Sequence, residues 1–541
     1  MARLDDYEHQ SDEDDYNDDA EWVDEDSDGD GDFEEYEDED DEDFDFEQAA
    51  LDAEEMEELE RGSDAFQFFF GMMDETRTNP NKRAHALTEE CIGEKNERRP
   101  SRDKGEGISE HATKSRRRSV YGLLMERELG PFRSNSTVPM AKQIIPNRTK
   151  KVMDKYGARA YSGQFSEDGN FFYLCTQDFQ VHLYDTSDPA NIQPKVSIQG
   201  EIGRWTITDC ALSPDNRNII YSSITPQVYI TSADLGEDEE RRQTALDFDQ
   251  DDEREFGIWS IRFSGDGREI VAGASNSCLY VYDIETRNVL HQIPGHADDV
   301  NAVCFADASS SHILYSASDD SFVKIWDRRS LGRNSHPAGV FVGHTEGVTY
   351  LDSKNDGRFA LSNGKDQQMK MWDLRKCMEY NQFVGDETLE PGYFREEWDY
   401  RIGRYPGPRN FRHPRDNSVQ TFVGHSVLKT LIRCHFSPAH STGQQFVYGG
   451  SADGKVRVWN MEGEVIRELN TGEALSDTSF ANTQLSDDTI FEFLRPRRLM
   501  VSNVTRDCSW HPHLPYMIST SWCGVGGAFG AAIVHEYMHE D

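Results

Sequence analysis

The sequence predicts an all-β protein, a propeller of seven four-stranded blades that follows a long acidic N-terminal region. Two observations predict this fold. From about residue 160 one pattern recurs, in which an apolar strand, a polar turn and an alternating strand end in an aromatic residue followed by Asp or Asn. Gly-His pairs recur in the same region, each ahead of one copy of the pattern. Short strands repeated at even spacing are typical of propeller blades.

Five copies of this pattern are clear. In each copy, a turn residue lies six positions before the closing aromatic residue. The five pairs are Asp178/Tyr184, Asn276/Tyr282, Asp320/Trp326, Asp366/Trp372 and Asp453/Trp459. Trp326 and Trp372 are separated by roughly one WD40 repeat, which is about 40–45 residues long and supplies one four-stranded blade. The repeats therefore predict a seven-bladed WD40 β-propeller.

The seven blades are expected within residues 136–541, interrupted by insertions at 377–419 and 471–499. The first two blades are the weakest, because the first lacks a Gly-His pair and the second lacks the aromatic-Asp ending. The expected blades span residues 161–200, 203–235, 256–294, 298–340, 346–376, 420–470 and 504–537.

The fixed spacing within each copy has a structural reason. Six residues carry the chain from the turn to the middle of the next strand, where the turn carboxylate can accept a hydrogen bond from the imidazole of a Gly-His pair. That imidazole can contact a strand hydroxyl group, which can reach the indole N–H. A buried polar network must be fully satisfied, so we interpret its members as structural residues and not as ligands or bases. They are His296, Asp320, His344, Asp366, His425 and Asp453.

Residues 1–135 have a different composition, acidic at first and then basic. The chain of 541 residues has a net charge of −45, and its first 60 residues hold 33 Asp and Glu and one basic residue, Arg3. Such a segment has too little apolar surface to offset the entropy of ordering, so we expect most of it to be disordered. Residues 47–61 differ, because their helix formers and rough apolar stripe predict a short helix.

Composition also bears on the compartment. The nine cysteines are scattered singly, which is typical of a reducing environment. No apolar signal-peptide core is present at the N-terminus, and the longest weakly polar run, GVGGAFGAAIV, is too short to cross a bilayer. The stretch KSRRRS at 114–119 is either a solvated linker or a nuclear-import signal. We expect a protein of the nucleus and cytoplasm without a membrane segment.

The motif HEYMH, from His535 to His539, is the one feature that favours an enzyme. A zinc peptidase carries H-E-x-x-H on a helix, so that both histidines face one metal, and it needs a third ligand. Here several glycines precede the motif, which argues against a helix, and the sequence suggests no third ligand. We interpret the motif as a chance match on the last strand of the last blade. We therefore expect no catalytic activity, no metal and no cofactor.

The endings of two repeats are longer than a propeller requires. They read Trp326-Asp327-Arg328-Arg329 and Trp372-Asp373-Leu374-Arg375, so that both extend Trp-Asp to Trp-Asp-x-Arg. This pattern resembles the motif by which WD40 substrate receptors dock on the damaged-DNA-binding adaptor of cullin-4 RING ubiquitin ligases. The stretches DDVNAVCFAD, EEWDYR and LIRCHFSPAHSTGQQFVYGGSADGKV also resemble a receptor of that family and its plant relatives. The resemblance covers roughly residues 140–470.

The resemblance implies a substrate-recognition subunit that binds the adaptor and presents a target protein for ubiquitination and proteasomal degradation, without catalysis by this chain. The implied adaptor-binding residues are Trp326, Asp327, Arg329, Trp372, Asp373 and Arg375. A WD40 scaffold for a nuclear complex outside any ligase stays open as the alternative. The C-terminal SWCGVGGAFGAAIVHEYMHED and residues 471–499 depart from the family pattern, which leaves the closure of the seventh blade open.

The target is expected at the mouth of the central channel, where the innermost strands begin. Aromatic residues and arginines dominate protein–protein hot spots, and the matching positions of successive blades hold both. These candidate residues are Arg204, Trp205, Trp259, Asn301, Thr349, Arg433 and Arg506. Two or more arginines facing the channel would favour an acidic or phosphorylated degron, whereas side chains that pack inward would only join the blades. Neither a nucleic acid nor a membrane is expected as a partner.

Overall fold

The computed structural model describes residues 144–539, except 202, 234–241, 250–255, 332–335, 397, 402, 409–410, 477–500 and 526. All of them belong to one compact unit, Pro80–Asp541. The expected acidic tail, the helix at 47–61 and the KSRRRS stretch lie outside the described residues. Within the described part, no helix is long and apolar enough to span a membrane.

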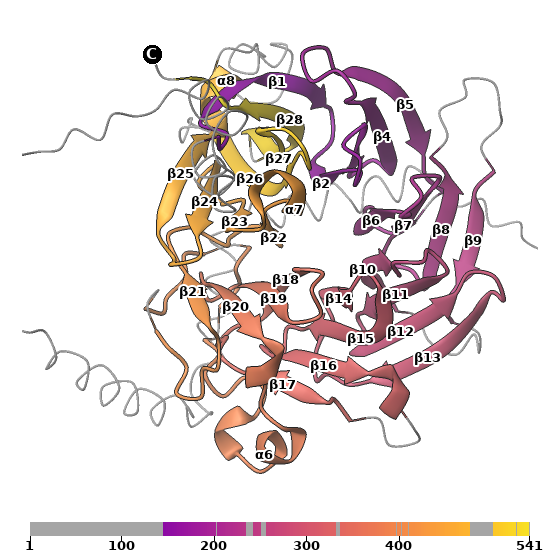
Figure 1. The fold of residues 1–541 in the computed structure, drawn as a ribbon, viewed down its shortest axis with the longest axis vertical. Coiled ribbons are helices and arrows are strands. Elements are labelled where there is room, and N and C mark those ends of the chain that lie inside the picture. The colour runs from indigo at the N-terminus through magenta and orange to yellow at the C-terminus, as the bar shows by residue number, and fades with distance from the viewer. Residues whose placement is uncertain are drawn as a thin grey trace, which may run out of the picture. The chain divides into compact units, whose positions relative to one another are not determined.

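Seven four-stranded antiparallel sheets form a ring (Figure 1), so the seven-bladed WD40 fold is confirmed. From the innermost strand outward, blades one to three are β2 (Ala160–Phe165), β3 (Phe171–Thr176), β4 (Gln180–Asp185), β5 (Gln193–Gln199); β6 (Asp209–Leu212), β7 (Asn218–Ser222), β8 (Gln227–Ser232), β9 (Thr244–Asp247); and β10 (Ile258–Phe263), β11 (Glu269–Ala274), β12 (Cys278–Asp283), β13 (Asn288–Pro294).

Blades four to seven follow the same order. They are β14 (Ala302–Asp307), β15 (Ser310–Ala317), β16 (Val323–Asp327), β17 (Gly339–Phe341); β18 (Val348–Ser353), β19 (Phe359–Gly364), β20 (Met369–Asp373), β21 (Gln420–Phe422); β22 (Cys434–Phe436), β23 (Phe446–Gly449), β24 (Lys455–Asn460), β25 (Val465–Asn470); and β26 (Val501–Trp510), β27 (Tyr516–Val525), β28 (Phe529–Glu536), β1 (Arg148–Tyr156). Short helices are η1 (Arg328–Ser330), η2 (Leu374–Lys376), α6 (Tyr380–Val384), η3 (Glu387–Leu389), α7 (Ala439–Thr442) and α8 (Thr471–Ser476).

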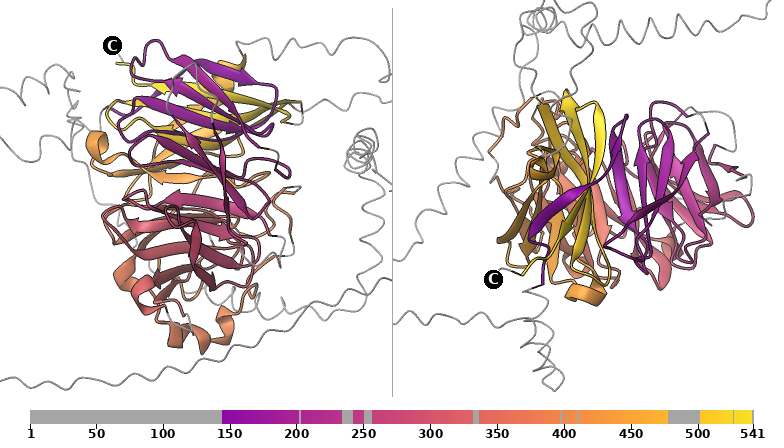
Figure 2. Two further views of the ribbon diagram at one scale, coloured as in Figure 1. Left: turned by 90° about the vertical axis from the view of Figure 1, so that its right-hand side faces the viewer. Right: turned by 90° about the horizontal axis from the view of Figure 1, so that it is seen from above.

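Burial explains which strands the repeats reveal. The second and third strands of a blade lie between neighbouring blades and are buried on both faces, as in β11 and β12. The outermost strands β5 and β13 are mostly exposed and carry polar residues. An apolar run therefore marks the inner strands, whereas the outer strands are hard to distinguish from loops. In the side views, the strands of each blade run from one flat face of the ring to the other (Figure 2).

The seventh blade is closed by a strand from before the first blade. β1 pairs antiparallel with β28, with Thr149 opposite His535 and Tyr156 opposite Gly530. The seven expected blades began at residue 161, so this strand was missed. Its sequence, RTKKVMDKY, has five basic or acidic residues and an exposed outer face, which gives it no apolar signature. The unusual C-terminal sequence thus forms β27 and β28 of a complete blade.

The fourth strand of the fifth blade comes after the first insertion. β21 pairs with β20, with Phe422 opposite Met369, so residues 377–419 lie within blade five and not between two blades. The expected sixth blade, 420–470, accordingly begins later, at Cys434. The second insertion opens with α8, which packs beside β1, and residues 477–500 lie outside the described part.

Candidate adaptor and substrate interfaces

Blades four and five contain the polar network that the repeat spacing predicts. In blade four, His296 Nδ1 lies 2.8 Å from an Asp320 carboxylate oxygen and Nε2 lies 2.7 Å from Ser316 Oγ, which also accepts from Trp326 Nε1 at 2.8 Å. Burial lowers the pKa of His296. Although burial alone would raise the pKa of Asp320, His296 and Lys324 hold it below the usual value. The imidazole is thus committed to the blade.

The same arrangement recurs one blade later. His344 contacts Asp366 at 2.9 Å and Ser362 at 2.7 Å, and Trp372 Nε1 donates to the Ser362 hydroxyl at 2.8 Å. All four side chains are buried. Neither histidine therefore offers a lone pair to an outside ligand.

Blade six departs from the predicted network. His425 Nε2 lies 2.8 Å from Asn363 Oδ1 of blade five, and Trp459 Nε1 donates to the Val423 carbonyl at 3.0 Å. Asp453 binds Arg457 instead of His425. The expected pairing of His425 with Asp453 was wrong, because the position that carries Ser316 in blade four is Gly449 here. Without that hydroxyl group the imidazole and the indole have no shared partner.

In blade seven the HEYMH motif replaces Trp-Asp. His535 lies opposite Met517 on β28, two positions from Ser519, as Trp326 lies relative to Ser316. Its Nε2 is 2.8 Å from Ser519 Oγ and its Nδ1 is 3.1 Å from Thr149 Oγ1 of β1. Burial lowers the pKa of His535 to about 3. The first histidine of the motif is thus a core residue that ties β1 into the blade.

The remaining residues of the motif do not converge with His535 on one point. Glu536 pairs with Lys150 at 2.6 Å, and His539 is exposed beyond the end of β28. Within the described residues, no group of three His, Cys, Asp or Glu side chains could hold a metal ion. The motif therefore lacks zinc-peptidase geometry.

The two Trp-Asp-x-Arg motifs hold their last arginine in one geometry. Asp327 caps η1 and accepts from Arg329 Nε at 2.9 Å and Nη2 at 2.8 Å. Asp373 caps η2 and accepts from Arg375 Nε at 3.3 Å and Nη2 at 3.1 Å. The arginine side chains are 65% and 67% exposed. Each aspartate thus presents a pre-oriented guanidinium group to solvent at the end of the third strand.

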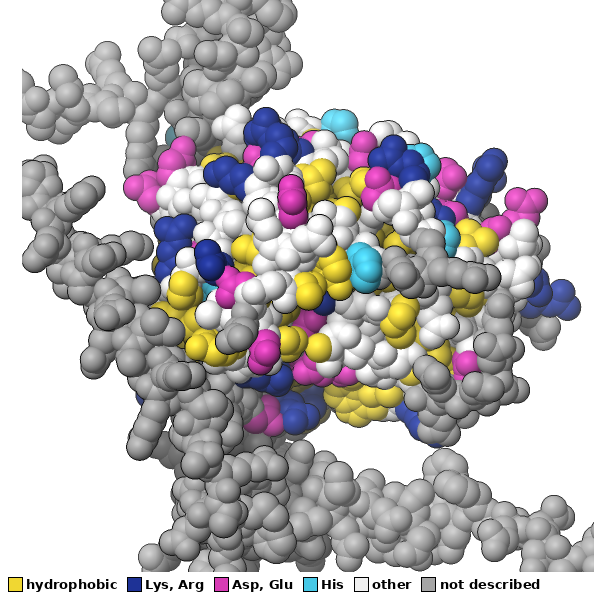
Figure 3. All heavy atoms as spheres, turned by 90° about the horizontal axis from the view of Figure 1, so that it is seen from below, with side chains coloured by type: hydrophobic (Ala, Val, Ile, Leu, Met, Phe, Trp, Pro, Cys, Tyr) yellow, Lys and Arg dark blue, Asp and Glu magenta, His cyan; other side chains and the backbone are white. Residues whose placement is uncertain are grey.

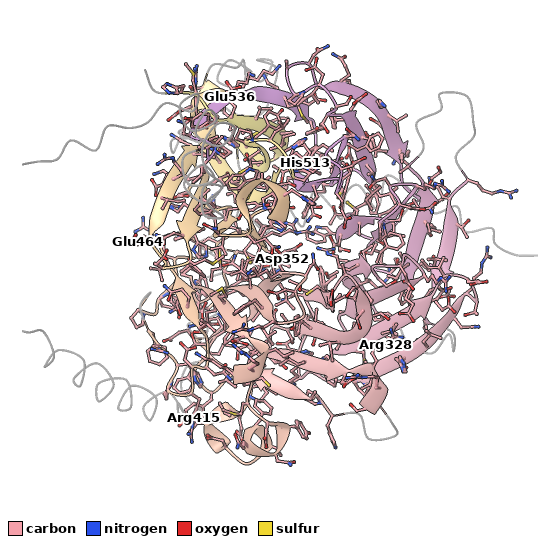
Figure 4. All side chains as sticks on the ribbon, viewed as in Figure 1. Arg328, Asp352, Arg415, Glu464, His513 and Glu536 are labelled. Atoms are coloured by element: carbon pink, nitrogen blue, oxygen red, sulfur yellow. The ribbon has the colours of Figure 1, made fainter. Side chains whose placement is uncertain are left out.

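Other motif residues have structural roles. Trp326 and Trp372 are fully buried, so they cannot contact an adaptor and serve to place the strand ends. Arg328 points toward the neighbouring blade three, where it donates to both carboxylate oxygens of Glu269, at 2.6 and 2.8 Å. Figure 4 shows Arg328 toward the outer part of blade four and Asp352 near the ring centre. Exposure is therefore what separates Arg329 from its neighbour in sequence.

Four of the seven predicted mouth residues are buried and join blades. Arg433 donates to Asp209 at 2.7 Å and lies 3.6 Å from Asp507. Arg506 donates to Thr430 and stacks on Tyr161. Asn301 donates to the Asp319 carboxylate and the Val348 carbonyl, and Thr349 donates to the Ile432 carbonyl. The prediction that these four side chains form the mouth was wrong, because the ring packs them inward.

A buried charged network joins blades two, three, six and seven. Asp209 accepts from Arg262 Nη1 at 2.6 Å and from Arg433 Nη2 at 2.7 Å. Burial alone would raise the pKa of Asp209, yet these two guanidinium groups lower it to about 2. His435 contacts Asp507 at 2.9 Å. Arg433 is therefore paired with carboxylates inside the ring, and Arg506 is buried against Thr430 and Tyr161.

The other three predicted residues do lie at the surface. Arg204 is exposed, Trp205 is 53% exposed and Trp259 is half-buried. The rings of Trp205 and Trp259 have centroids 6.5 Å apart and planes at 78°. The ring centroid of Tyr161 lies 5.8 Å from that of Trp205, and the ring centroid of Trp522 lies 5.2 Å from that of Tyr161. These four rings form a row across blades three, two, one and seven, which we call the aromatic row.

Sequence reasoning missed part of this surface. Tyr161 and Trp522 fell outside the matching positions, although both lie in strands that the repeats identify. It also missed residues 393–405, where Glu396 N donates to Glu346 at 2.7 Å and Tyr400 lies 4.4 Å from the Lys365 ammonium group. No repeat signal could place this segment, because it belongs to an insertion.

On the outer rim near α6, basic, acidic and apolar side chains are interspersed (Figure 3).

Known proteins match most of the chain. The "WD domain, G-beta repeat" family matches residues 416–460 and the WDR54 family matches residues 258–383. The LEC14B homolog of Prunus armeniaca is 38% identical, with 75% of this chain and 80% of the relative covered. The "DDB1- and CUL4-associated factor 11 homolog" of Caenorhabditis briggsae is 32% identical, with 74% and 68% covered, and that of Caenorhabditis elegans is 33% identical, with 70% and 62% covered.

The chain belongs to the family of LEC14B and DDB1- and CUL4-associated factor 11. The expected resemblance to cullin-4-associated receptors is thereby confirmed. In this family the WD40 propeller is a non-catalytic scaffold for protein interactions. A fold alone does not specify partners. The candidate contact surfaces are the two described above, the motif arginines and the aromatic row.

Proposed function

We propose that this chain is the substrate-recognition subunit of a cullin-4 RING ubiquitin ligase. Arg329 and Arg375 bind the DDB1 adaptor, and the opposite face of the propeller holds a target protein for ubiquitination. The observation that carries the proposal is a geometry repeated on adjacent blades. In each, an exposed arginine donates to both carboxylate oxygens of the aspartate two residues before it. The names of the nematode relatives state association with DDB1 and CUL4 and support the same partner.

The pairing of each arginine with its aspartate explains why arginine suits this position. A guanidinium group can use its remaining N–H groups in planar pairing with a carboxylate of the partner. Because the aspartate already restricts the side chain, less conformational entropy is lost on binding. Lysine at either position would keep the charge but lose the planar pairing.

The test is a double substitution, Arg329→Ala with Arg375→Ala, in the full chain. We expect adaptor affinity to fall by more than about tenfold, because an arginine paired across an interface is lost on each of two blades. Circular dichroism and melting temperature should stay unchanged, since both side chains are exposed. Affinity is measured by pull-down and by titration with purified adaptor.

A matched control removes two other exposed arginines from neighbouring blades, Arg217→Ala with Arg287→Ala. This control should bind adaptor normally. Normal binding by the double variant of Arg329 and Arg375 would contradict the docking role and favour a scaffold outside the ligase. An altered melting temperature would show that the motif arginines stabilise the ring.

A further inference from the structure

The backbone at the channel mouth displays one large aromatic side chain in an unusual conformation. Trp205 has a φ of 69°, a left-handed conformation that bulky residues rarely adopt and that costs free energy. The rings of Tyr161 and Trp259 both pack edge-on against it. The fold thus keeps about half of the Trp205 side chain exposed to solvent, although its burial would be more favourable. Such strain is typical of binding sites.

A carboxylate lies beside the inner of these two rings, because the Trp259 side chain contacts Asp299. Asp298 pairs with Arg395 at 3.3 Å and Asp319 pairs with Lys365 at 2.8 Å, whereas Asp299 forms no ion pair within the described residues. Burial, Asp319 and Asp298 raise the pKa of Asp299 to about 6, while the neighbouring Trp259 side chain and Lys365 act in the other direction. At neutral pH the carboxyl group is therefore mostly charged and would be stabilised by a cation.

The combination of groups is specific for one ligand chemistry. Tryptophan faces attract Lys and Arg side chains through the ring quadrupole, and a carboxylate supplies the countercharge. We propose that Trp205, Trp259 and Asp299 bind a lysine or arginine side chain of the target protein, with the cation against the indoles and paired with the carboxylate. The proposal rests on the proposed function only in assigning this side chain to a target. It reverses the charge of the degron that the sequence suggested.

Arg204 provides the competing outcome. It is exposed and directly precedes Trp205, so an acidic ligand would be attracted to it instead. Lys429, on the loop before β22, is a second exposed cation. The charge preference of the mouth is therefore a decisive measurement, because the two pairings predict opposite ligands.

In the test, the nine tryptophans of the full chain are replaced by 5-fluorotryptophan. Their signals are followed by fluorine NMR. Trp205→Phe and Trp259→Phe assign the two signals. The probes are the Nα-acetyl methylamides of lysine, arginine and glutamate. We expect the lysine and arginine probes to shift both signals and the glutamate probe to shift neither. Asp299→Asn should weaken the binding of the cationic probes several-fold, and Glu285→Gln, on an exposed turn of blade three, should not.

Two results would overturn the proposal. One is an equal or larger response to the glutamate probe, which would assign the mouth to an acidic ligand through Arg204. The other is the absence of any response, or a response that Asp299→Asn leaves unchanged while the melting temperature is normal. Because no adaptor is present, either failure leaves the proposed receptor function standing, and the adaptor titration tests that function separately.

Discussion

At the scale of single residues, spacing identifies turns better than it identifies partners. The pairs Asp320/Trp326 and Asp453/Trp459 have the same spacing, and only the first belongs to the predicted network. The difference lies in Ser316 and Gly449, two residues on another strand whose pairing with the tryptophan strand cannot be read from a local motif. The mouth shows the same limit, because sequence position did not reveal whether an arginine points outward or into the ring.

The shared hydroxyl group of blade four gives a direct prediction. Ser316→Ala removes the acceptor of the Trp326 indole and the partner of His296 Nε2, both of which are buried. A buried polar group that loses its partner costs about 1–3 kcal/mol, so the free energy of unfolding should fall by that order. Ser309→Ala, in the exposed turn of the same blade, should change it little. Equal denaturant midpoints for the two variants would contradict this role.

His535 predicts a pH dependence with a definite sign. Its pKa is about 3 in the folded protein against an ordinary value of 6.5, so between these values the unfolded chain binds the extra proton. Stability from this residue is therefore complete above about pH 6.5 and decreases as the pH falls toward 3. The difference in melting temperature between the native protein and His535→Gln should shrink from pH 7 to pH 4. A constant difference would show that the residue does not titrate on unfolding.

At the scale of elements, apolar alternation predicted the inner strands, and the outer strands escaped it. β1 shows the consequence, since RTKKVMDKY carries more charge than apolar surface and is recognised only by its seven register pairs with β28. The insertion 377–419 likewise separates β21 from the rest of its blade. Both cases depend on pairing between distant segments, which local sequence does not encode.

The closing strand gives the next prediction. Removing residues 1–157 deletes β1 and leaves blade seven with three strands, whereas removing residues 1–143 retains the full blade. The first deletion should cost on the order of 5 kcal/mol, because several ladder hydrogen bonds of about 1 kcal/mol each are lost. Melting temperatures of the two proteins measure the difference. Equal temperatures would mean that β1 contributes nothing to closure.

The helix expected at residues 47–61 lies outside the described residues and stays a prediction. Its sequence combines helix formers with an apolar stripe in an otherwise acidic segment, which favours a role in docking on the adaptor. Deleting residues 47–61 should weaken adaptor binding, while deleting residues 31–45, an acidic stretch of equal length, should not. Titration with purified adaptor compares the two, and equal dissociation constants would exclude the helix from the interface.

At the scale of the whole molecule, the antiparallel blade separates the two surfaces. The innermost strand of each blade begins at the face that carries Trp205 and Trp259, and the third strand ends at the opposite face with Arg329 or Arg375. A strand of six residues is about 20 Å long. The proposed target and the proposed adaptor would therefore occupy separate faces and would not compete for surface.

This separation predicts that the two surfaces act independently. Substitutions further apart than about 10 Å with no shared partners have additive effects to within roughly 0.5 kcal/mol. Arg329→Ala with Arg375→Ala should leave the affinity for the lysine probe unchanged, and Trp205→Ala with Asp299→Asn should leave adaptor affinity unchanged. The protein with all four substitutions should show both losses at their separate magnitudes, measured by the fluorine and adaptor titrations. A coupling free energy well above that limit would mean that the buried charged network, through Asp209 and Arg433, transmits binding from one face of the ring to the other.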